Sequence, residues 1–297
     1  IELVMSRLEV LKTYKIYIGG KFPRTESGRY YTPLNAKGDQ LGNICLSSRK
    51  DMRNAVVAAR KALGGWSERA AFNRSQILYR IAEMLEGRKS QFIEELIFQG
   101  STRKNAEKEV SIAIDRLIYY AGWCDKYGQV LSSVNPVSSP HFNFTSLESM
   151  GVVGVCADEK TSLIGLISLV APVIAGGNTC VVIASESKPL CAVTFAEVLN
   201  SSDVPGGVVN ILTGKIEELL SHMAVHMDVN AIIYSGDDKK RIILLEEESI
   251  HNLKRIRTYN LDWMKADSQN LFMIADCQEA KTTWHPIENI GGASSSY

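Results

Sequence analysis

This sequence lacks an excess of either charge, and it lacks a long apolar run. Lys plus Arg and Asp plus Glu number 33 each among 297 residues, so the formal net charge is zero. A neutral chain has no electrostatic reason to bind nucleic acid or an anionic membrane surface, so we expect neither partner. The longest apolar run, residues 163–177, is too short and too interrupted to span a bilayer.

The sequence also lacks any paired cysteine motif. Its six cysteines are scattered without a C-x-x-C pair, which argues against a metal site or a disulfide framework and indicates a cytoplasmic protein. No secretory signal is visible. The first residue is Ile1 and not Met, so we expect this chain to be a piece of a longer one.

The part of the chain up to about residue 128 has the apolar spacing of helices. Apolar side chains recur every three or four residues within 51–64, 77–85 and 106–121, which predicts three amphipathic helices. Ahead of them, residues 16–22 predict a strand, a glycine turn and a second strand. After them, residues 142–147 alternate like a half-exposed strand.

From Gly151 onward, short apolar runs alternate with helical segments. Continuous β-branched strands separated by helices predict a parallel sheet that is covered on both faces. Right-handed crossovers then make this a doubly wound α/β domain. We expect strands at 152–157, 179–184, 208–212 and 231–234, and helices near 163–175, 190–200, 216–225 and 239–248.

Four stretches carry a family resemblance. They are YIGGKF at 17–22, AVVAARKALGGWSERAAFNRSQILYRIAEMLEGR at 55–88, GVVGV at 151–155 with APVIAGGNTCVVIASE at 171–186, and VPGGVVNILTG at 204–214. In this order and spacing they resemble the aldehyde dehydrogenase superfamily. The resemblance implies a Rossmann-like coenzyme domain with an N-terminal helical segment and a bridging strand segment.

The resemblance also implies a domain division. Residues 1–14 are expected to be a linker, and residues 15–257 a coenzyme-domain-like unit in which 129–150 form bridging strands for oligomerisation. Residues 258–297 are expected to be a remnant of the catalytic subdomain and a tail. Within that tail, residues 268–276 resemble a strand of the family.

Two positions bear on catalysis. The family's oxyanion-binding Asn corresponds to Lys160, which could donate to an oxyanion or could be a solvated lysine in an acidic turn. The family's general-base Glu corresponds to Tyr259. A tyrosine with an ordinary pKa of about 10 suits a resting base poorly.

Three positions bear on coenzyme binding, and we regard them as vestigial. Glu186 corresponds to a ribose-binding Glu whose companion Lys is replaced by Ile183; the alternative is an exposed first-turn charge of a helix. Ser235 and Gly236 correspond to the turn that meets the pyrophosphate. Asp237 and Asp238 follow them, and aspartates there would cap the helix and repel a diphosphate. NAD binding is therefore expected to be weak or absent.

The catalytic cysteine has no counterpart, because the chain ends before its position. Cys156 and Cys180 fall in expected strands, where a buried apolar role is the default. Cys277 with His285 is the remaining candidate for a reactive pair, against the simpler reading of an unreactive thiol.

A coenzyme-domain half that ends without the family's general-base motif and is followed by a short tail is similar to the truncated, non-catalytic C-terminal half of family 16 aldehyde dehydrogenases. That resemblance implies a structural or assembly role beside a dehydrogenase unit of the same longer chain, and a homodimer. The alternative is an NAD(P)-dependent oxidoreductase acting on aldehydes, as part of a longer chain. No metal is expected.

Overall fold

The computed structural model describes residues 11–287. Its first elements are three short strands, β1 (Thr13–Tyr14), β2 (Tyr30–Tyr31) and β3 (Asn43–Cys45), which form a small sheet in the order β1-β3-β2. The glycine turn expected near residue 19 is present, with Gly19 and Gly20 both at positive φ. The strands expected beside it are not: Ile18 and Lys21 form a single antiparallel bridge.

Five helices follow, and the two longest of them begin at side-chain caps. They are α1 (Arg49–Ser67), α2 (Ala71–Gly87), α3 (Lys89–Phe98), α4 (Arg103–Trp123) and α5 (Tyr127–Leu131). Ser48 and Asp51 form a capping box at the start of α1, and Thr102 caps α4. The three helices expected from the apolar spacing are thus α1, α2 and α4.

The central sheet has five parallel strands in the order β10-β9-β6-β7-β8. They are β6 (Val152–Cys156), β7 (Thr179–Ile183), β8 (Val209–Leu212), β9 (Ala231–Ser235) and β10 (Arg255–Tyr259). The first four match the expected strands within two residues. The edge strand β10 was not predicted, because its charged, partly exposed side chains lack the apolar signal of a buried strand.

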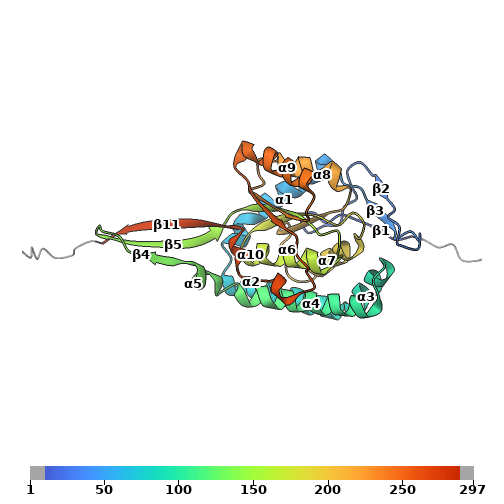
Figure 1. The fold of residues 1–297 in the computed structure, drawn as a ribbon, viewed down its shortest axis with the longest axis horizontal. Coiled ribbons are helices and arrows are strands. Elements are labelled where there is room, and N and C mark those ends of the chain that lie inside the picture. The colour runs from blue at the N-terminus through green and yellow to red at the C-terminus, as the bar shows by residue number, and fades with distance from the viewer. Residues whose placement is uncertain (1–10, 288–297) are drawn as a thin grey trace, which may run out of the picture.

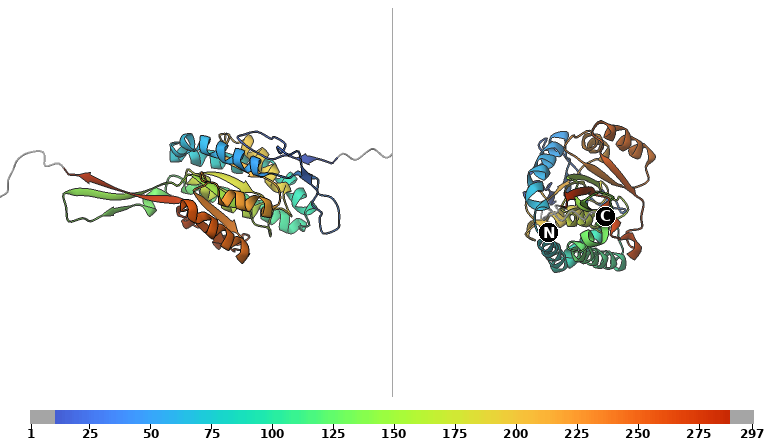
Figure 2. Two further views of the ribbon diagram at one scale, coloured as in Figure 1. Left: turned by 90° about the horizontal axis from the view of Figure 1, so that it is seen from above. Right: turned by 90° about the vertical axis from the view of Figure 1, so that its left-hand side faces the viewer.

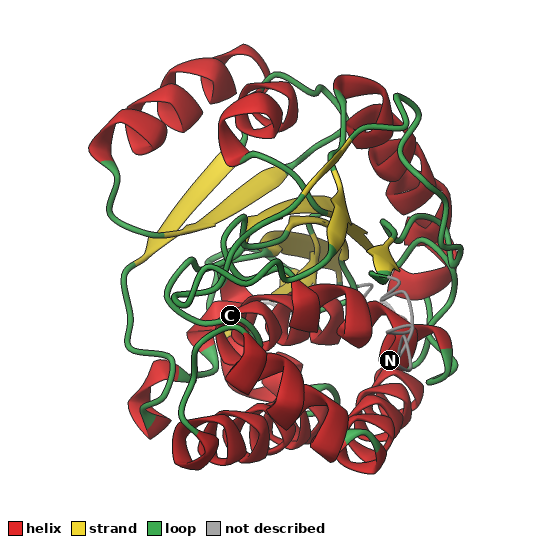
Figure 3. Cartoon of the chain, turned by 90° about the vertical axis from the view of Figure 1, so that its right-hand side faces the viewer, coloured by secondary structure: helices red, strands yellow, loops and turns green. Residues whose placement is uncertain are grey.

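Helices cover both faces of this sheet, which confirms the doubly wound α/β architecture. They are α6 (Ile164–Ala175), α7 (Leu190–Asn200), α8 (Ile216–Ala224) and α9 (Lys239–Ser249), ending in the 3₁₀ turn η1 (Ile250–Asn252). One core packs α1, α8 and α9 on the sheet; the other packs α6 and α7, with α2 and α4 outside them (Figure 1, Figure 3). Because α6 lies between the sheet and the outer helices, every one of its residues is buried.

A three-stranded antiparallel sheet projects from the body as an arm (Figure 1, Figure 2). Its strands are β4 (Ser133–Asn135), β5 (His141–Ser149) and β11 (Gln278–Pro286), in the order β11-β5-β4. The strand expected at 142–147 is β5. The strand resemblance of residues 268–276 was wrong, because that stretch contains η2 (Ala266–Ser268) and the short helix α10 (Phe272–Ala275).

Residues 260–277 join the body to the arm, and we call them the connecting segment. They lead from the end of β10 to the start of β11, so the expected boundary at residue 257 falls inside β10. The described part of the chain after the connecting segment forms the third arm strand.

Candidate functional site

The order of the strands defines one crevice where a ligand is expected. From β6 the chain passes to β7 and β8 on one side, and then returns to β9 and β10 on the other. In open α/β sheets, ligands bind outside the carboxyl ends of the strands at the point where the order reverses. That point lies here between β6 and β9, where the loops of residues 157–163 and 236–238 meet. We call this place the switch-point crevice.

Trp263 of the connecting segment occupies the switch-point crevice. Its indole Nε1 donates to Ser235 Oγ at the end of β9, at 3.2 Å. A Cβ added to Gly165, at the start of α6, would lie 3.1 Å from Cδ1 of the indole. The side chain is 1% exposed. Trp263 therefore fills the space between the end of β9 and the beginning of α6, and the sequence contained no local pattern that would reveal this contact.

Arg116 of α4 holds the connecting segment in place. Its guanidinium donates to the backbone oxygens of Trp263, Lys265 and Ser268, at 2.8–3.2 Å, and to Ser168 Oγ of α6 at 2.9 Å. Arg116 is 1% exposed, and burial lowers its pKa. Among the described residues, no carboxylate forms a salt bridge with it. Its interactions are thus directed at backbone carbonyls, which fixes the path of the segment.

The helix N-termini that border the crevice already have carboxylate partners. Glu109 of α4 is buried, and its Oε1 accepts from the amides of Leu163 and Ile164, at 2.9 and 3.1 Å, at the start of α6. At the start of α9, Asp238 Oδ1 accepts from the amides of Lys240 and Arg241. The capping expected of Asp238 is confirmed. These amides are the groups with which a helix N-terminus would bind a phosphate.

Asp237 does not share in that cap. Its Oδ2 accepts from Asn260 Nδ2 at 3.0 Å, and Asn260 Oδ1 accepts from Lys160 Nζ at 2.9 Å. Asn260 therefore links the β9–α9 turn to the β6–α6 loop across the crevice. Lys160 is exposed, as expected for a solvated lysine in that loop.

Ser235 and Gly236 both have partners inside the chain. Ser235 is buried beneath the Trp263 indole, and the amide of Gly236 donates to the carbonyl oxygen of Tyr259 at 2.9 Å. The turn expected to meet a pyrophosphate is thus joined to β10 and to the connecting segment.

Glu186 lies in a loop, which corrects the reading of an exposed residue in the first turn of a helix. The helix after β7 begins at Leu190, and Glu186 is half-buried ahead of it. Its Oε2 accepts from the amide of Ile216 at the start of α8, at 3.3 Å. Glu186, on the loop between β7 and α7, therefore caps the N-terminus of α8.

Glu159 is a residue of this site that the sequence did not single out. Its carboxylate accepts from Ser185 Oγ, from the amide of Glu186 and from the amide and hydroxyl of Ser187, at 2.7–3.2 Å. This is how a loop commonly binds an anion. Beside it remains an open pocket of about 420 Å³, lined by Tyr31, Pro33, Leu34, Glu159, Glu186, Ser187, Ile216 and Arg241.

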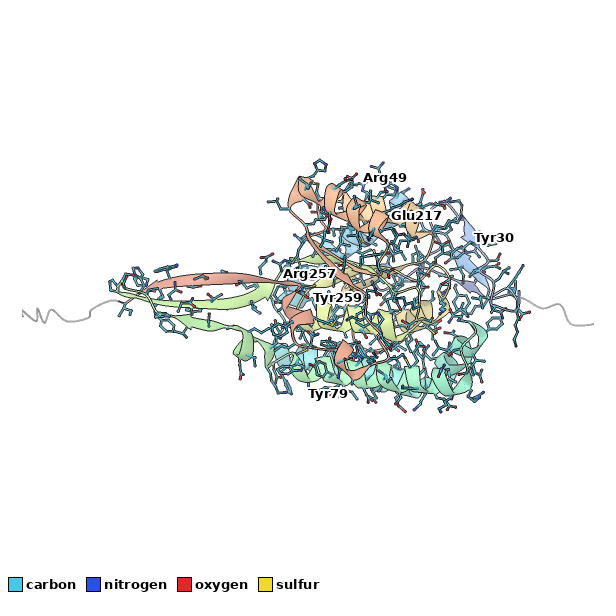
Figure 4. The ribbon with its side chains drawn as sticks, viewed as in Figure 1. Tyr30, Arg49, Tyr79, Glu217, Arg257 and Tyr259 are labelled. Atoms are coloured by element: carbon cyan, nitrogen blue, oxygen red, sulfur yellow. The ribbon has the colours of Figure 1, made fainter. Side chains whose placement is uncertain are left out.

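Tyr259, at the end of β10, is a hydrogen-bond donor with a raised pKa. Its hydroxyl donates to Asp276 Oδ2 at 2.6 Å, while Arg257 Nε lies 2.9 Å from Asp276 Oδ1. Burial first, and then the Asp276 carboxylate, raise the pKa of Tyr259 well above its usual range. Figure 4 labels Tyr259 and Arg257 on this strand, beside the base of the arm. A tyrosine so held stays protonated and cannot act as a resting base.

Cys277 and His285 do not form a reactive pair, and the simpler reading of an unreactive thiol at Cys277 agrees with the structure. Cys277 is fully buried, and desolvation raises the pKa of its thiol to about 12. His285 lies near the tip of the arm, opposite Phe142 in the register of β11 and β5. Eight residues of extended strand separate the two by roughly 26 Å. The other five cysteines are buried as well, so no thiol in the chain is accessible.

Within residues 11–287 no group of three or more His, Cys, Asp or Glu side chains is placed to hold a metal ion. Over the same residues no helix combines the length and apolarity needed to cross a membrane.

The chain is similar in sequence to known proteins of one family. The model of the aldehyde dehydrogenase family matches residues 23–258. DhaS of Bacillus subtilis (strain 168), named as an aldehyde dehydrogenase, is 33% identical over 257 residues, which are 83% of this chain and 51% of that protein. The mouse cytosolic 10-formyltetrahydrofolate dehydrogenase is 29% identical over 262 residues, 86% of this chain and 29% of its own length. The chain thus spans about half or less of these relatives.

A solved structure shares the fold. The NAD⁺ complex of an aldehyde dehydrogenase from Bacillus cereus superposes with a TM-score of 0.79 at 25% identity, covering 83% of this chain and 50% of that one. The residues that the family model matches, 23–258, include the loops that border the switch-point crevice.

Proposed function

Since the chain belongs to the aldehyde dehydrogenase family, we propose that it is a non-catalytic unit of that family with a structural role beside a catalytic unit. One observation carries the proposal: the chain's own side chains occupy the donors and the space of the switch-point crevice. Trp263 fills the crevice, and Glu109 and Asp238 accept from the helix amides at its border.

The chemistry of the crevice supports the absence of aldehyde oxidation. Such a reaction needs a nucleophile, an oxyanion donor and a base. All six thiols are buried, and Tyr259 stands protonated at the position of the family's base. Of these three groups, only the oxyanion donor has a possible counterpart, the exposed ammonium of Lys160. That ammonium donates to Asn260.

The same contacts favour weak NAD binding or none. A diphosphate in the crevice would have to displace Asp238 from the start of α9 and would meet the charge of Asp237. Moving the Asp238 carboxylate away from the helix N-terminus costs free energy. Bringing the diphosphate close to the Asp237 carboxylate costs more, because like charges repel.

The arm offers a surface for assembly. Val134, Phe142 and Trp284 are 68%, 47% and 57% exposed on its three strands. Val134 and Phe142 lie on one face of the arm and Trp284, paired with Asn143, on the other. Exposed apolar side chains on a projecting sheet are typical of a segment that another protein covers. We propose that this partner is the dehydrogenase unit of the same longer chain or a second copy of this chain, as a homodimer. The tandem arrangement of family 16 would supply both partners, a dehydrogenase unit in the same chain and a second copy in a homodimer.

The test is an NADH titration followed by fluorescence, together with an assay of aldehyde-dependent NAD⁺ reduction, on this 297-residue chain. We expect no saturable NADH signal up to millimolar coenzyme and no turnover. Micromolar binding with turnover would overturn the proposal.

The alternative function is that of an NAD(P)-dependent oxidoreductase acting on aldehydes as part of a longer chain. The open pocket beside Glu186 and Arg241 favours it, because an adenosine could enter there without displacing Trp263. Relatives of the fold bind NAD. Saturable NADH binding that is lost in Glu186→Gln but retained in the exposed control Glu246→Gln would support this alternative.

A further inference from the structure

A pocket of about 280 Å³ lies between the start of α1 and the end of α8. It is lined by Arg49, Met52, Arg53, His222, Val225, His226 and Met227. Residues 225–227 come before β9, so they lie at the amino end of that strand, whereas the switch-point crevice lies at the carboxyl ends of the strands. Figure 4 labels Arg49 on the body, away from the arm. The pocket is therefore separate from both the crevice and the arm.

Two arginines of α1 bring positive charge to this pocket. Arg49 is the first residue of the helix and Arg53 lies four residues later, so both side chains project from one face. Like charges at this spacing repel, and the helix dipole disfavours a cation at the first residue. Within residues 11–287, neither guanidinium forms a salt bridge. Both residues are exposed, so an anion from solution can reach them.

The carboxylates on the neighbouring segments have other partners. None of the acidic side chains in the described part of the chain lines the pocket itself. Glu26 pairs with Lys50, Asp51 accepts from the amides of Ser48 and Glu26, Glu218 pairs with Arg29, and Asp228 pairs with Arg60. The charge of the two arginines is thus left for a ligand to neutralise.

His226 adds a hydrogen-bond donor to the pocket. Its Nδ1 accepts from the amide of Asp228 at 3.2 Å, so in the neutral ring Nε2 carries the hydrogen and can donate. Burial is the main cause that lowers the pKa of His226, and the Asp228 carboxylate opposes it. The charges of Lys254, Arg53 and Arg60 lower this pKa further. Three cations against one carboxylate therefore act on the ring, and an added anion would offset this excess.

The remaining walls of the pocket are apolar. Met52 is fully buried, while Val225 and Met227 are exposed. Covering such side chains with hydrocarbon contributes about 25 cal/mol per Å² of apolar surface removed from water. A bare inorganic anion would leave this surface wet, so the walls favour an anion that carries an apolar group. Among such anions, the planar carboxylate matches the fork of a guanidinium.

We propose that this pocket binds a carboxylate with a short apolar chain, its charged end held by Arg49 and Arg53 and its chain placed against Val225 and Met227. His226 supplies a further donor to the carboxylate. The site requires neither NAD nor a catalytic function of this chain. It would give the protein a small-molecule ligand of the organic-acid class.

The probe for the test is hexanoate, titrated calorimetrically into the whole chain at constant ionic strength. Hexan-1-ol and hexylammonium are the neutral and cationic counterparts, and acetate keeps the charge but lacks the chain. We expect saturable binding of hexanoate alone. Arg53→Gln removes one of the two charges and should weaken binding roughly tenfold or more. Arg103→Gln, which changes an exposed arginine of α4 on the other side of the sheet, should bind as the wild type does.

The absence of saturable hexanoate binding to the wild-type chain would overturn the proposal, and this measurement needs no variant to fold. Equal binding of hexan-1-ol would overturn it because the charge would then not be recognised. Equal binding of acetate would overturn it because the apolar walls would then take no part. Unchanged affinity in both Arg49→Gln and Arg53→Gln, with circular dichroism spectra that match the wild type, would also overturn it.

Discussion

Tyr259 donates a 2.6 Å hydrogen bond to Asp276, and this contact joins the last strand of the central sheet to the base of the arm. The Asp276 carboxylate also forms a salt bridge with Arg257, which lies two residues before Tyr259 on β10. Arg255, a further two residues earlier, donates to the carbonyl oxygens of Asp276 and Gln278. Alternate side chains of one edge strand therefore hold the beginning of β11, and Tyr259 acts here as a structural residue.

Tyr259→Phe should destabilise the chain by about 1–3 kcal/mol, because the half-buried carboxylate of Asp276 loses a hydrogen-bond donor. It should also change the dependence of stability on pH. The folded chain raises the pKa of Tyr259 above the unfolded value of about 10, so this contribution is complete below pH 10 and is lost as the pH rises further. Urea unfolding at about pH 8 and about pH 11, one below and one above the ordinary tyrosine pKa, should show a smaller loss of stability at high pH in the variant than in the wild type. Equal slopes would contradict this role.

Trp263→Ala should be strongly destabilising, while Trp284→Ala should not. Removal of the buried indole of Trp263 leaves a cavity in the switch-point crevice and should cost about 3–5 kcal/mol. Trp284 is 57% exposed on the arm, so its removal should change the free energy of unfolding by no more than about 0.5 kcal/mol. Thermal or urea unfolding of the two variants measures both effects.

Trp284→Ala should instead weaken self-association. If a second copy covers the exposed apolar side chains of the arm, sedimentation velocity should show a larger monomer fraction for Trp284→Ala than for the wild type at equal concentration. Phe72→Ala, an exposed aromatic residue of α2, serves as the control. Identical sedimentation of all three proteins as oligomers would exclude the arm residue from the contact.

Arg116→Lys should destabilise the chain although the charge is kept. The planar guanidinium reaches three backbone oxygens of the connecting segment and one hydroxyl, and a lysine cannot reproduce that geometry. A loss of about 2–4 kcal/mol is expected from buried acceptors left unpaired. Arg80→Lys, whose exposed side chain pairs with Glu83, should be nearly neutral in the same urea titration. A neutral Arg116→Lys would show that the segment is held by packing alone.

The thiols should be unreactive in the folded chain. All six cysteines are buried, and desolvation raises the pKa of Cys124, Cys156 and Cys277 to about 12. Ellman's reagent at neutral pH should therefore detect no rapid thiol in the native chain and all six after denaturation. A single fast-reacting cysteine would argue for a nucleophile and against the non-catalytic proposal.

The sequence predicts those elements whose signal is local. The buried strands β6 to β9 are continuous β-branched runs bounded by glycine turns, and their predicted bounds agree with the structure within two residues. The edge strand β10 has alternate arginines, which pair with carboxylates far along the chain, so no apolar pattern marks it.

The site was less predictable, because its decisive contacts join distant residues. Asp238 could be recognised as a cap from its position ahead of a helix. Trp263 contacts Ser235, Glu109 of α4 contacts the start of α6, and Glu159 contacts the β7–α7 loop, at separations of up to 55 residues along the chain. Only the fold brings these side chains to the same edge of the sheet.

The pairing of β11 with β5 has a consequence for the order in which the protein is made. Gln278 pairs with Ser149 and Pro286 with His141, so nine residues of β5 receive their main partner strand more than a hundred residues after their own synthesis. Until then β5 is held only along the three residues of β4 and presents an open edge. The arm is therefore completed only after the central sheet has been synthesised, and a chain stalled within the connecting segment would display an unpaired strand to its neighbours.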